Sequence, residues 1–337
     1  MPIGIDLPLI WTGIIAFAVF MYVLMDGFDL GVGILFPFAP SEEDRDVMMN
    51  TVAPVWDGNE TWLILGGAGL FGAFPLAYAV VLPAMYLPIL LMLIALIFRG
   101  VAFEFRFKAG PRDRRLWTAA FALGSIFATF AQGLVLGGFI QGIRVEGRDF
   151  AGGILDWLSP FSVMTGLGLI AGYALVGAAW LVWKTEGLLQ DWAFRLARLL
   201  LFAVLFFIVL VSLWTPLFND AVAERWFSWP NILYFSPVPV VTLLLAVWML
   251  RSLNRFDEVL PFFQSVGLFL LSYLGLAISL WPNLIPPSIT LWEAAAPPET
   301  QIFLLVGVGT LLPVIVGYTA FTYYVFRGKV RRAAGYH

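Results

Sequence analysis

Nine long apolar runs leave this chain essentially one kind of fold. Their approximate limits are 8–38, 57–74, 76–107, 117–142, 160–183, 197–216, 231–250, 260–281 and 302–326. A helix needs about 20 apolar residues to cross a bilayer, whereas a barrel strand is about 10 residues long and alternates in character. Because lipid offers no hydrogen bonds to the backbone, runs of this length must be helical. The sequence therefore predicts an all-α polytopic membrane protein, with about nine transmembrane helices in one domain over residues 1–337.

The composition supports this class and excludes several kinds of chemistry. Hydrophobic residues make up 61% of the chain and charged residues 12%, against about 45–50% and about 25% in soluble domains. There is no cysteine, and the only histidine is His337. Disulfides and thiolate sites are excluded, and no internal imidazole is present to ligate haem or another metal. We expect no metal site and no cofactor ligated by this chain, and we expect the first apolar run to be a retained span.

The lysines and arginines predict the orientation, because basic residues are enriched in cytoplasmic loops. With nine spans the termini lie on opposite sides of the membrane. Placing the N-terminus on the periplasmic side leaves only Arg144, Arg148 and Arg225 outside, out of 19 basic residues. The other sixteen then lie on the cytoplasmic side. The sequence predicts an N-terminus outside, a C-terminus inside, and a multi-pass protein of a bacterial inner membrane.

The first apolar run contains two carboxylates, which are costly in a membrane span. Asp26 and Asp29 are three residues apart and lie on one helix face, which Tyr22 and Gly33 share. Two carboxylates this close in a medium of low dielectric cannot easily both be ionised. One of them is therefore expected to carry a proton near neutral pH. Gly27 and Gly31 form a pair of small residues suited to close helix approach.

Further charges lie at the ends of the second and third runs. Asp57 and Glu60 share a face at the start of the second run, where helix capping is the alternative role for Asp57. Arg99 and Glu104 lie at the end of the third run. The alternative for Glu104 is an ordinary ion pair with Lys108, four residues further on.

These charged residues share one depth in the predicted topology, near the cytoplasmic side. Acidic groups reached from the cytoplasm, with one arginine to keep part of them charged, suit proton uptake. Two alternatives remain open. The cluster could be a buried ion-pair network that only holds helices together. It could instead bind a substrate cation in a proton-coupled transporter, although no interrupted helix pair recurs in two halves of the chain.

Four segments carry a resemblance to a known family. Residues 26–33, DGFDLGVG, and residues 53–63, APVWDGNETWL, resemble two signature motifs of subunit II of cytochrome bd-type quinol oxidases, including the cyanide-insensitive members. Residues 98–106, FRGVAFEFR, and 288–293, SITLWE, resemble two further blocks. The blocks follow the family's order and spacing from the first span to the last.

The resemblance implies a haem-free subunit of a complex that oxidises quinol and reduces dioxygen to water. Its partner in a heterodimer, subunit I, is expected to carry both b-type haems, haem d (or haem b in its place) and the quinol site. A small single-span subunit, lipid and a bound quinone are further expected partners, and nucleic acid is not.

The resemblance also assigns residues. Asp26 and Asp57 match positions on a proton path from the cytoplasm, and we add Asp29, Glu60 and Glu104 to that path. Supporting roles are expected for Arg99 and for three residues of the second motif, Trp56, Asn59 and Trp62. Trp62 matches a position near an oxygen access route.

Overall fold

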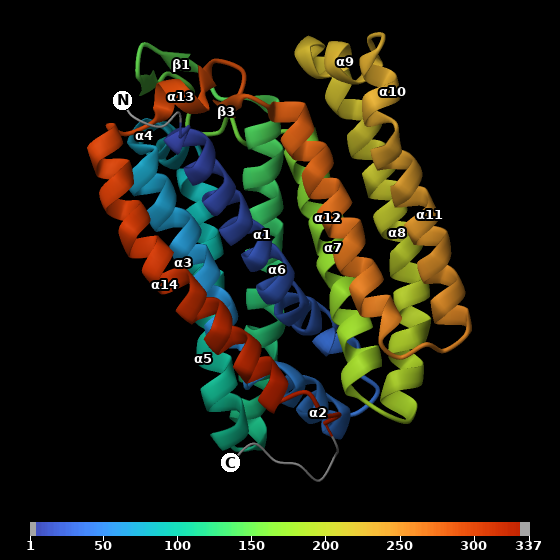
Figure 1. Cartoon of the computed structure of the whole chain (residues 1–337). Coiled ribbons are helices and arrows are strands. Elements are labelled where there is room, and N and C mark those ends of the chain that lie inside the picture. Colours follow the sequence, from blue (N-terminus) through green and yellow to red (C-terminus); the bar gives the residue numbers. More distant parts are fainter. Residues whose placement is uncertain (1–4, 331–337) are drawn as a thin grey trace.

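The chain forms a bundle of long helices capped by short elements at both ends (Figure 1). A computed structural model describes residues 5–330. The elements, in chain order, are α1 (Leu7–Leu35), α2 (Glu42–Val52), α3 (Trp56–Ala73), α4 (Pro75–Ala84), α5 (Tyr86–Lys108), α6 (Pro111–Gln141), β1 (Val145–Glu146), β2 (Asp149–Phe150), α7 (Pro160–Lys184), α8 (Leu188–Phe218), α9 (Asp220–Phe227), α10 (Asn231–Phe235), α11 (Pro237–Asn254), α12 (Leu260–Leu280), β3 (Asn283–Ile285), β4 (Ile289–Thr290), α13 (Leu291–Ala294) and α14 (Pro298–Val325).

The predicted class, an all-α polytopic membrane protein, is confirmed. Within residues 5–330, 8 helical segments are long and apolar enough to cross a membrane. The remaining predicted run is α3, whose 18 residues extend over about 27 Å at 1.5 Å per residue. Asp57 and Glu60 make this helix less apolar than the others, and it packs along α1 inside the bundle.

Two predicted runs are each divided into two helices. The run 76–107 breaks at Met85, between α4 and α5. Pro88 has no N–H to donate to the carbonyl of Ala84, and its ring would clash with that carbonyl in a continuous helix. The run 231–250 breaks at Ser236, because Pro237 has no N–H to donate to the carbonyl of Leu233. That carbonyl accepts a hydrogen bond of 3.2 Å from the Ser236 hydroxyl instead. Helices α6, α8 and α14 also begin earlier than predicted, at Pro111, Leu188 and Pro298.

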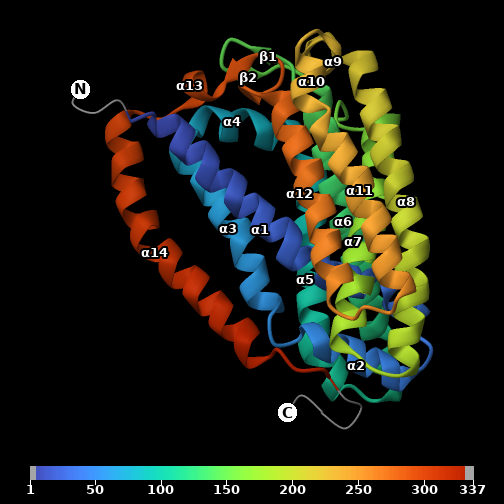
Figure 2. The same ribbon diagram turned by 45° about the vertical axis from the view of Figure 1, so that its right-hand side comes forward.

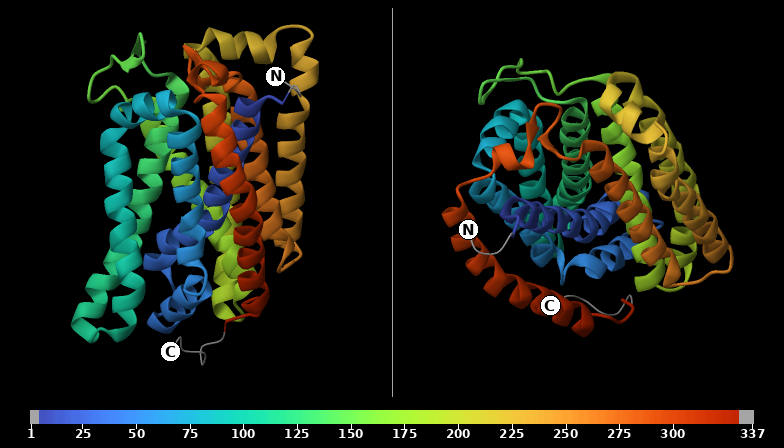
Figure 3. Two further views of the ribbon diagram at one scale, coloured as in Figure 1. Left: turned by 60° about the vertical axis from the view of Figure 1, so that its left-hand side comes forward. Right: turned by 45° about the horizontal axis from the view of Figure 1, so that its top comes forward.

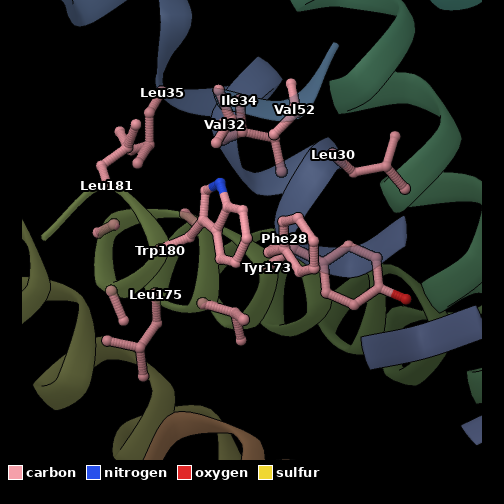
Figure 4. Packing of buried hydrophobic residues seen from close by; sticks show 14 of the residues in the cluster. Phe28, Leu30, Val32, Ile34, Leu35, Val52, Tyr173, Leu175, Trp180 and Leu181 are labelled. Carbon is pink, nitrogen blue, oxygen red and sulfur yellow. The ribbon is translucent and has the colours of Figure 1, made fainter. Parts of the chain in front are cut away.

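The core lies where α1, α6 and α7 cross. A Cβ atom built on Gly31 would lie 2.0 Å from the backbone oxygen of Tyr173, and one built on Gly177 would lie 2.4 Å from the carbonyl carbon of Gly31. The predicted close approach at Gly31 is therefore confirmed, with α7 as the neighbouring helix. Beside this crossing, Phe28 stacks on Trp180 with ring centroids 4.2 Å apart (Figure 4).

The two ends of the bundle differ in structure. One end carries α4, α9, α13 and the two antiparallel hairpins, in which Val145 pairs with Phe150 and Asn283 with Thr290 (Figure 3). The other end carries α2, which was not predicted, and the last turns of α5 and α14 (Figure 1). The start of α1 and the end of α14 lie at opposite ends, as an odd number of crossings requires.

Helix α14 lies on the outside of the bundle (Figure 2). None of its most apolar window is buried inside the described protein. Leu312 and Ile315, in the middle of the helix, pack against buried residues of α1 and α3, and hydrogen bonds attach it near its two ends. At the first, the Trp11 indole donates a hydrogen bond of 3.1 Å to the backbone oxygen of Gln301. At the second, Tyr323 contacts α3.

Candidate functional site

Arg99 of α5 is the centre of a buried ion cluster. Its side chain is fully buried, and its Nη1 atom lies 2.8 Å from Asp26 Oδ1. The same nitrogen contacts the Glu60 carboxylate, and Nη2 lies 3.7 Å from Asp29 Oδ2. Thus α1, α3 and α5 each contribute charge to one point. The predicted grouping of Asp26, Asp29, Glu60 and Arg99 is what the structure shows.

Asn59 and Tyr323 connect this cluster to the last helix. Asn59 Nδ2 donates hydrogen bonds to Asp29 Oδ2 at 2.7 Å and to the backbone oxygen of Met25 at 3.2 Å. The Tyr323 hydroxyl donates to Asn59 Oδ1 at 2.9 Å. Both polar atoms of the Asn59 amide are therefore hydrogen-bonded, and the amide fixes the position of the Asp29 carboxylate.

A second branch extends from the cluster into the core. Tyr22 lies one helical turn before Asp26 on α1. Gln132 of α6 donates a hydrogen bond of 2.7 Å to the Tyr22 hydroxyl. It also accepts a hydrogen bond of 2.9 Å from the hydroxyl of Tyr173 on α7. The Gln132 amide thus satisfies two buried tyrosine hydroxyls from two different helices.

The charge of the cluster is unbalanced. One guanidinium faces three carboxyl groups, and Asp29 Oδ1 is buried with no hydrogen-bond partner among the described residues. Excess buried negative charge is costly, and a carboxyl group relieves it by taking up a proton. The arrangement is therefore chemically able to accept and release protons.

Two of the predicted acidic residues lie outside this cluster. Glu104 is exposed and pairs with Lys108 at 3.3 Å, which is the alternative that the spacing allowed. Its place at the Arg99 cluster was a wrong prediction, because five residues turn Glu104 to another face of α5. Asp57 is exposed on α3, almost one turn before Glu60.

The two tryptophans of the second motif have packing contacts. Trp56 stacks on Phe103 of α5 with ring centroids 4.9 Å apart and an angle of 8°. Trp62 is 1% exposed and meets Phe17 of α1 edge to face at 5.7 Å. Trp56 holds α3 against α5, and Trp62 holds it against α1. Asn59 and Glu60, which lie between these two residues in the chain, are thereby held in position.

Sequence reasoning missed a second ion cluster at the α2 end. Arg106 is fully buried, with Nη1 2.6 Å from Asp46 Oδ1 and Nη2 3.3 Å from Glu42 Oε2. Partial burial raises the pKa of the Asp46 carboxyl, but hydrogen bonds from Arg114 and Arg106 outweigh it and lower that pKa overall. Arg106 follows Arg99 by seven residues and so shares its helix face, a pattern that could have indicated a second buried arginine.

No group of three or more histidine, cysteine, aspartate or glutamate side chains within residues 5–330 is arranged to hold a metal ion. His337 lies outside the described residues.

Comparisons with known proteins agree with the features described above. A family model described as cytochrome bd terminal oxidase subunit II matches residues 7–326. The chain is 27% identical to cytochrome bd-I ubiquinol oxidase subunit 2 of Escherichia coli, over 96% of this chain and 95% of that protein. It is 27% identical to cytochrome bd ubiquinol oxidase subunit 2 of Bacillus subtilis, over 95% and 96%. The fold is similar to a chain of the bd oxidase structure from Geobacillus thermodenitrificans, with a TM-score of 0.75 and 18% identity over 95% of this chain and 99% of that one.

Proposed function

The chain belongs to the cytochrome bd terminal oxidase subunit II family, and we propose that it is the haem-free subunit that brings cytoplasmic protons towards the oxygen-reducing site. It is a subunit of a quinol oxidase and a multi-pass protein of the bacterial inner membrane. The complex contains subunit I, which holds the haems of the family. Haem b groups and haem d (or haem b in its place) would supply the electron transfer and oxygen chemistry there.

The buried cluster around Arg99 is the observation that carries the proposal. Reduction of dioxygen to water consumes protons, and a membrane-embedded site needs polar groups to deliver them. Glu60 is 25% exposed and reaches from the surface of α3 to the guanidinium of Arg99, whose other contacts are Asp26 and Asp29. The route would run from Asp57 and Glu60 to the buried aspartates.

The orientation is part of the same proposal. Most of the basic residues in the described chain belong to α2, to the ends of α5, α7, α11 and α14, and to the starts of α6 and α8. All of these lie at the end of the bundle where α2 packs (Figure 1). By the enrichment of basic residues in cytoplasmic loops, this end faces the cytoplasm. The Arg99 cluster lies in the half of the bundle nearer that end.

Two other roles were compatible with the sequence. Membership of an oxidase family removes the support for a proton-coupled transporter. A purely structural cluster predicts instead that its loss costs haem content or assembly with subunit I, and not the rate of proton delivery. Subunit I remains the principal partner in this proposal; a single-span subunit, lipid and a bound quinone are further partners.

Neutral substitutions in the assembled oxidase test proton delivery. Asp57→Asn and Glu60→Gln remove the charge of two accessible carboxylates with little change in volume. We expect each variant to keep full haem content and to turn over more slowly, most of all at high pH, where protons are scarce. Glu104→Gln is the matched control, because Glu104 is an exposed glutamate paired only with Lys108. It should behave as the parent enzyme.

Normal turnover of Asp57→Asn and Glu60→Gln at full haem content, across the pH range, would refute the proton-delivery role. Loss of haem in these variants would support the structural role.

A further inference from the structure

Helices α8 and α11 pack against each other at the edge of the bundle away from α14 (Figures 1 and 2). Only 17% of the most apolar window of α8 is buried inside the described protein, and only 11% of the corresponding window in residues 231–254. The outer faces of both helices are therefore covered by something other than this chain, which is either lipid or another protein.

The outer face of α8 is an apolar stripe that ends in an arginine. Five side chains, each more than half exposed, follow one another at intervals of three and four residues and so lie on one face of the helix. They are Leu199, Phe202, Phe206, Val209 and Leu213. Arg195 continues the same spacing, four residues before Leu199, and it is exposed. The stripe therefore has a cation at its α2 end.

Helix α11 repeats this pattern in the opposite direction. Val241, Leu244 and Trp248 are exposed at intervals of three and four residues. The exposed Arg251 follows three residues later. Because α8 leaves the α2 end of the bundle and α11 returns to it, Arg195 and Arg251 lie at the same end. Each of the two neighbouring helices thus presents an apolar stripe with a guanidinium at its α2 end.

Contacts between the two helices bring these ends together. The Arg198 guanidinium donates a hydrogen bond of 3.1 Å to the backbone oxygen of Leu253. The rings of Phe194 and Phe256 meet with their centroids 5.2 Å apart. Arg255, which precedes Phe256, is also exposed. Three exposed guanidinium groups therefore belong to two chain segments that are in direct contact.

These three arginines lack protein counter-ions. Among the described residues, Arg195, Arg251 and Arg255 form no ion pair. The acidic residues nearest to them in the chain are Asp191 and Asp257, and neither pairs with them. The arginines beside α2, in contrast, are paired with carboxylates. A phosphate group matches the planar fork of a guanidinium, and basic pockets between membrane helices bind anionic lipid head groups.

We propose that these ends of α8 and α11 form a binding site for one anionic phospholipid of the leaflet on the α2 side. Arg195, Arg251 and Arg255 hold its phosphate, and the two apolar stripes receive its acyl chains. From Leu199 to Leu213 the stripe of α8 extends over about 21 Å at 1.5 Å per residue. One leaflet contains roughly 15 Å of hydrocarbon, so a complete acyl chain fits along this stripe.

A phospholipid matches this surface better than a protein partner does. A protein would have to bring its own anions to three neighbouring arginines. An anionic phospholipid carries its phosphate at the membrane surface, directly beside its acyl chains. The lipid site also shares no helix with the Arg99 cluster, which belongs to α1, α3 and α5. Failure of the lipid site would therefore leave the proposed proton route standing.

The test is native mass spectrometry of the complete oxidase in detergent during titration with phosphatidylglycerol. The parent should bind one phosphatidylglycerol more tightly than the zwitterionic phosphatidylethanolamine. Arg195→Gln combined with Arg251→Gln should weaken phosphatidylglycerol binding by about 30-fold, because each basic residue near an anionic head group contributes about fivefold. Equal affinity of the parent for the two lipids, or parent-like binding by the double variant, would overturn the site.

Arg112→Gln combined with Arg115→Gln is the matched control, since both arginines are exposed at the same end of the bundle on one helix, α6. This control removes the same charge and should bind phosphatidylglycerol as the parent does. Equal weakening in the two double variants would mean a diffuse attraction by the basic surface and would overturn a defined site. A folded Arg195→Gln, Arg251→Gln chain that no longer retains subunit I would mean that a protein covers this face, and it would overturn the lipid site as well.

A measurement on the parent decides the matter if the double variant is not produced in folded form. A phosphatidylglycerol with a photoactivatable acyl chain is added to the parent oxidase in the presence of excess phosphatidylethanolamine. Its adducts should fall within residues 195–213 and 241–255. Adducts confined to other helices would overturn the site.

Discussion

Gly31→Ala is expected to damage the oxidase through one added methyl group. The new Cβ would lie 2.0 Å from the backbone oxygen of Tyr173 and 2.9 Å from the backbone nitrogen of Gly177. Ordinary contact begins near 3.4 Å, so α1 and α7 must separate by about 1.4 Å. Both obstacles are backbone atoms inside a helix, and no side chain can rotate away to make room.

The cost follows from overpacking, which typically destabilises by about 1–3 kcal/mol. One kcal/mol shifts the melting temperature by about 2–4 °C in domains of roughly 150–250 residues, so we expect a drop of a few degrees. Asp29 lies two residues before Gly31, so the same displacement moves a carboxylate of the Arg99 cluster. Turnover should fall together with stability.

The control is Gly13→Ala on the same helix, where a Cβ atom would meet nothing within 4 Å. Alanine favours helix over glycine by up to about 1 kcal/mol, so this variant should be neutral or slightly more stable. The assay is thermal inactivation of the purified oxidase, followed by haem absorbance and by quinol-dependent oxygen uptake. Equal melting temperatures and rates for Gly31→Ala and the parent would refute the crossing described here.

Three further changes have definite expected outcomes. Arg106→Gln should loosen α2 from α5, because it leaves Asp46 without its buried partner; faster hydrogen exchange over residues 42–52 would show this, and unchanged exchange would contradict it. The lowered pKa of Asp46 means that its ionised form stabilises the fold. This stabilisation is present above about pH 4 and is lost as the pH falls through the folded-state pKa. Asp46→Asn should therefore flatten the acid limb of a plot of melting temperature against pH. Gln132→Leu should cost about 1–3 kcal/mol, because it removes the hydrogen bonds that the buried hydroxyls of Tyr22 and Tyr173 make to the Gln132 amide. A parent-like melting temperature would argue against a stabilising role of these two bonds.

Much of the fold could be predicted from the sequence, because lipid imposes strict rules on a spanning segment. Apolar length and the side preference of lysine and arginine decide the number and direction of spans before any tertiary contact is considered. The helix breaks at Met85 and Ser236 were missed. Both depend on single prolines, whose local effect is hidden inside a continuous apolar run.

The site was predictable only in part. The sequence identified Asp26, Asp29 and Arg99, because a charged side chain in a membrane span is costly and therefore rare. Tyr323 was missed, because a tyrosine near a helix end is ordinary in a membrane protein and its partner Asn59 is 264 positions away. Glu104 was misplaced because depth along a helix says nothing of the face on which a side chain lies.

The peripheral position of α14 has a consequence for how the protein is made. This helix follows all the other helices in the chain, and it supplies the hydroxyl that completes the Asn59–Asp29 contact. During synthesis the buried carboxylates of α1 are thus made before the tyrosine that completes this contact. The hydrogen bond from Tyr323 to Asn59 can therefore form only once the final helix packs against α3, so the order of the helices in the chain makes it the last contact of this network to form.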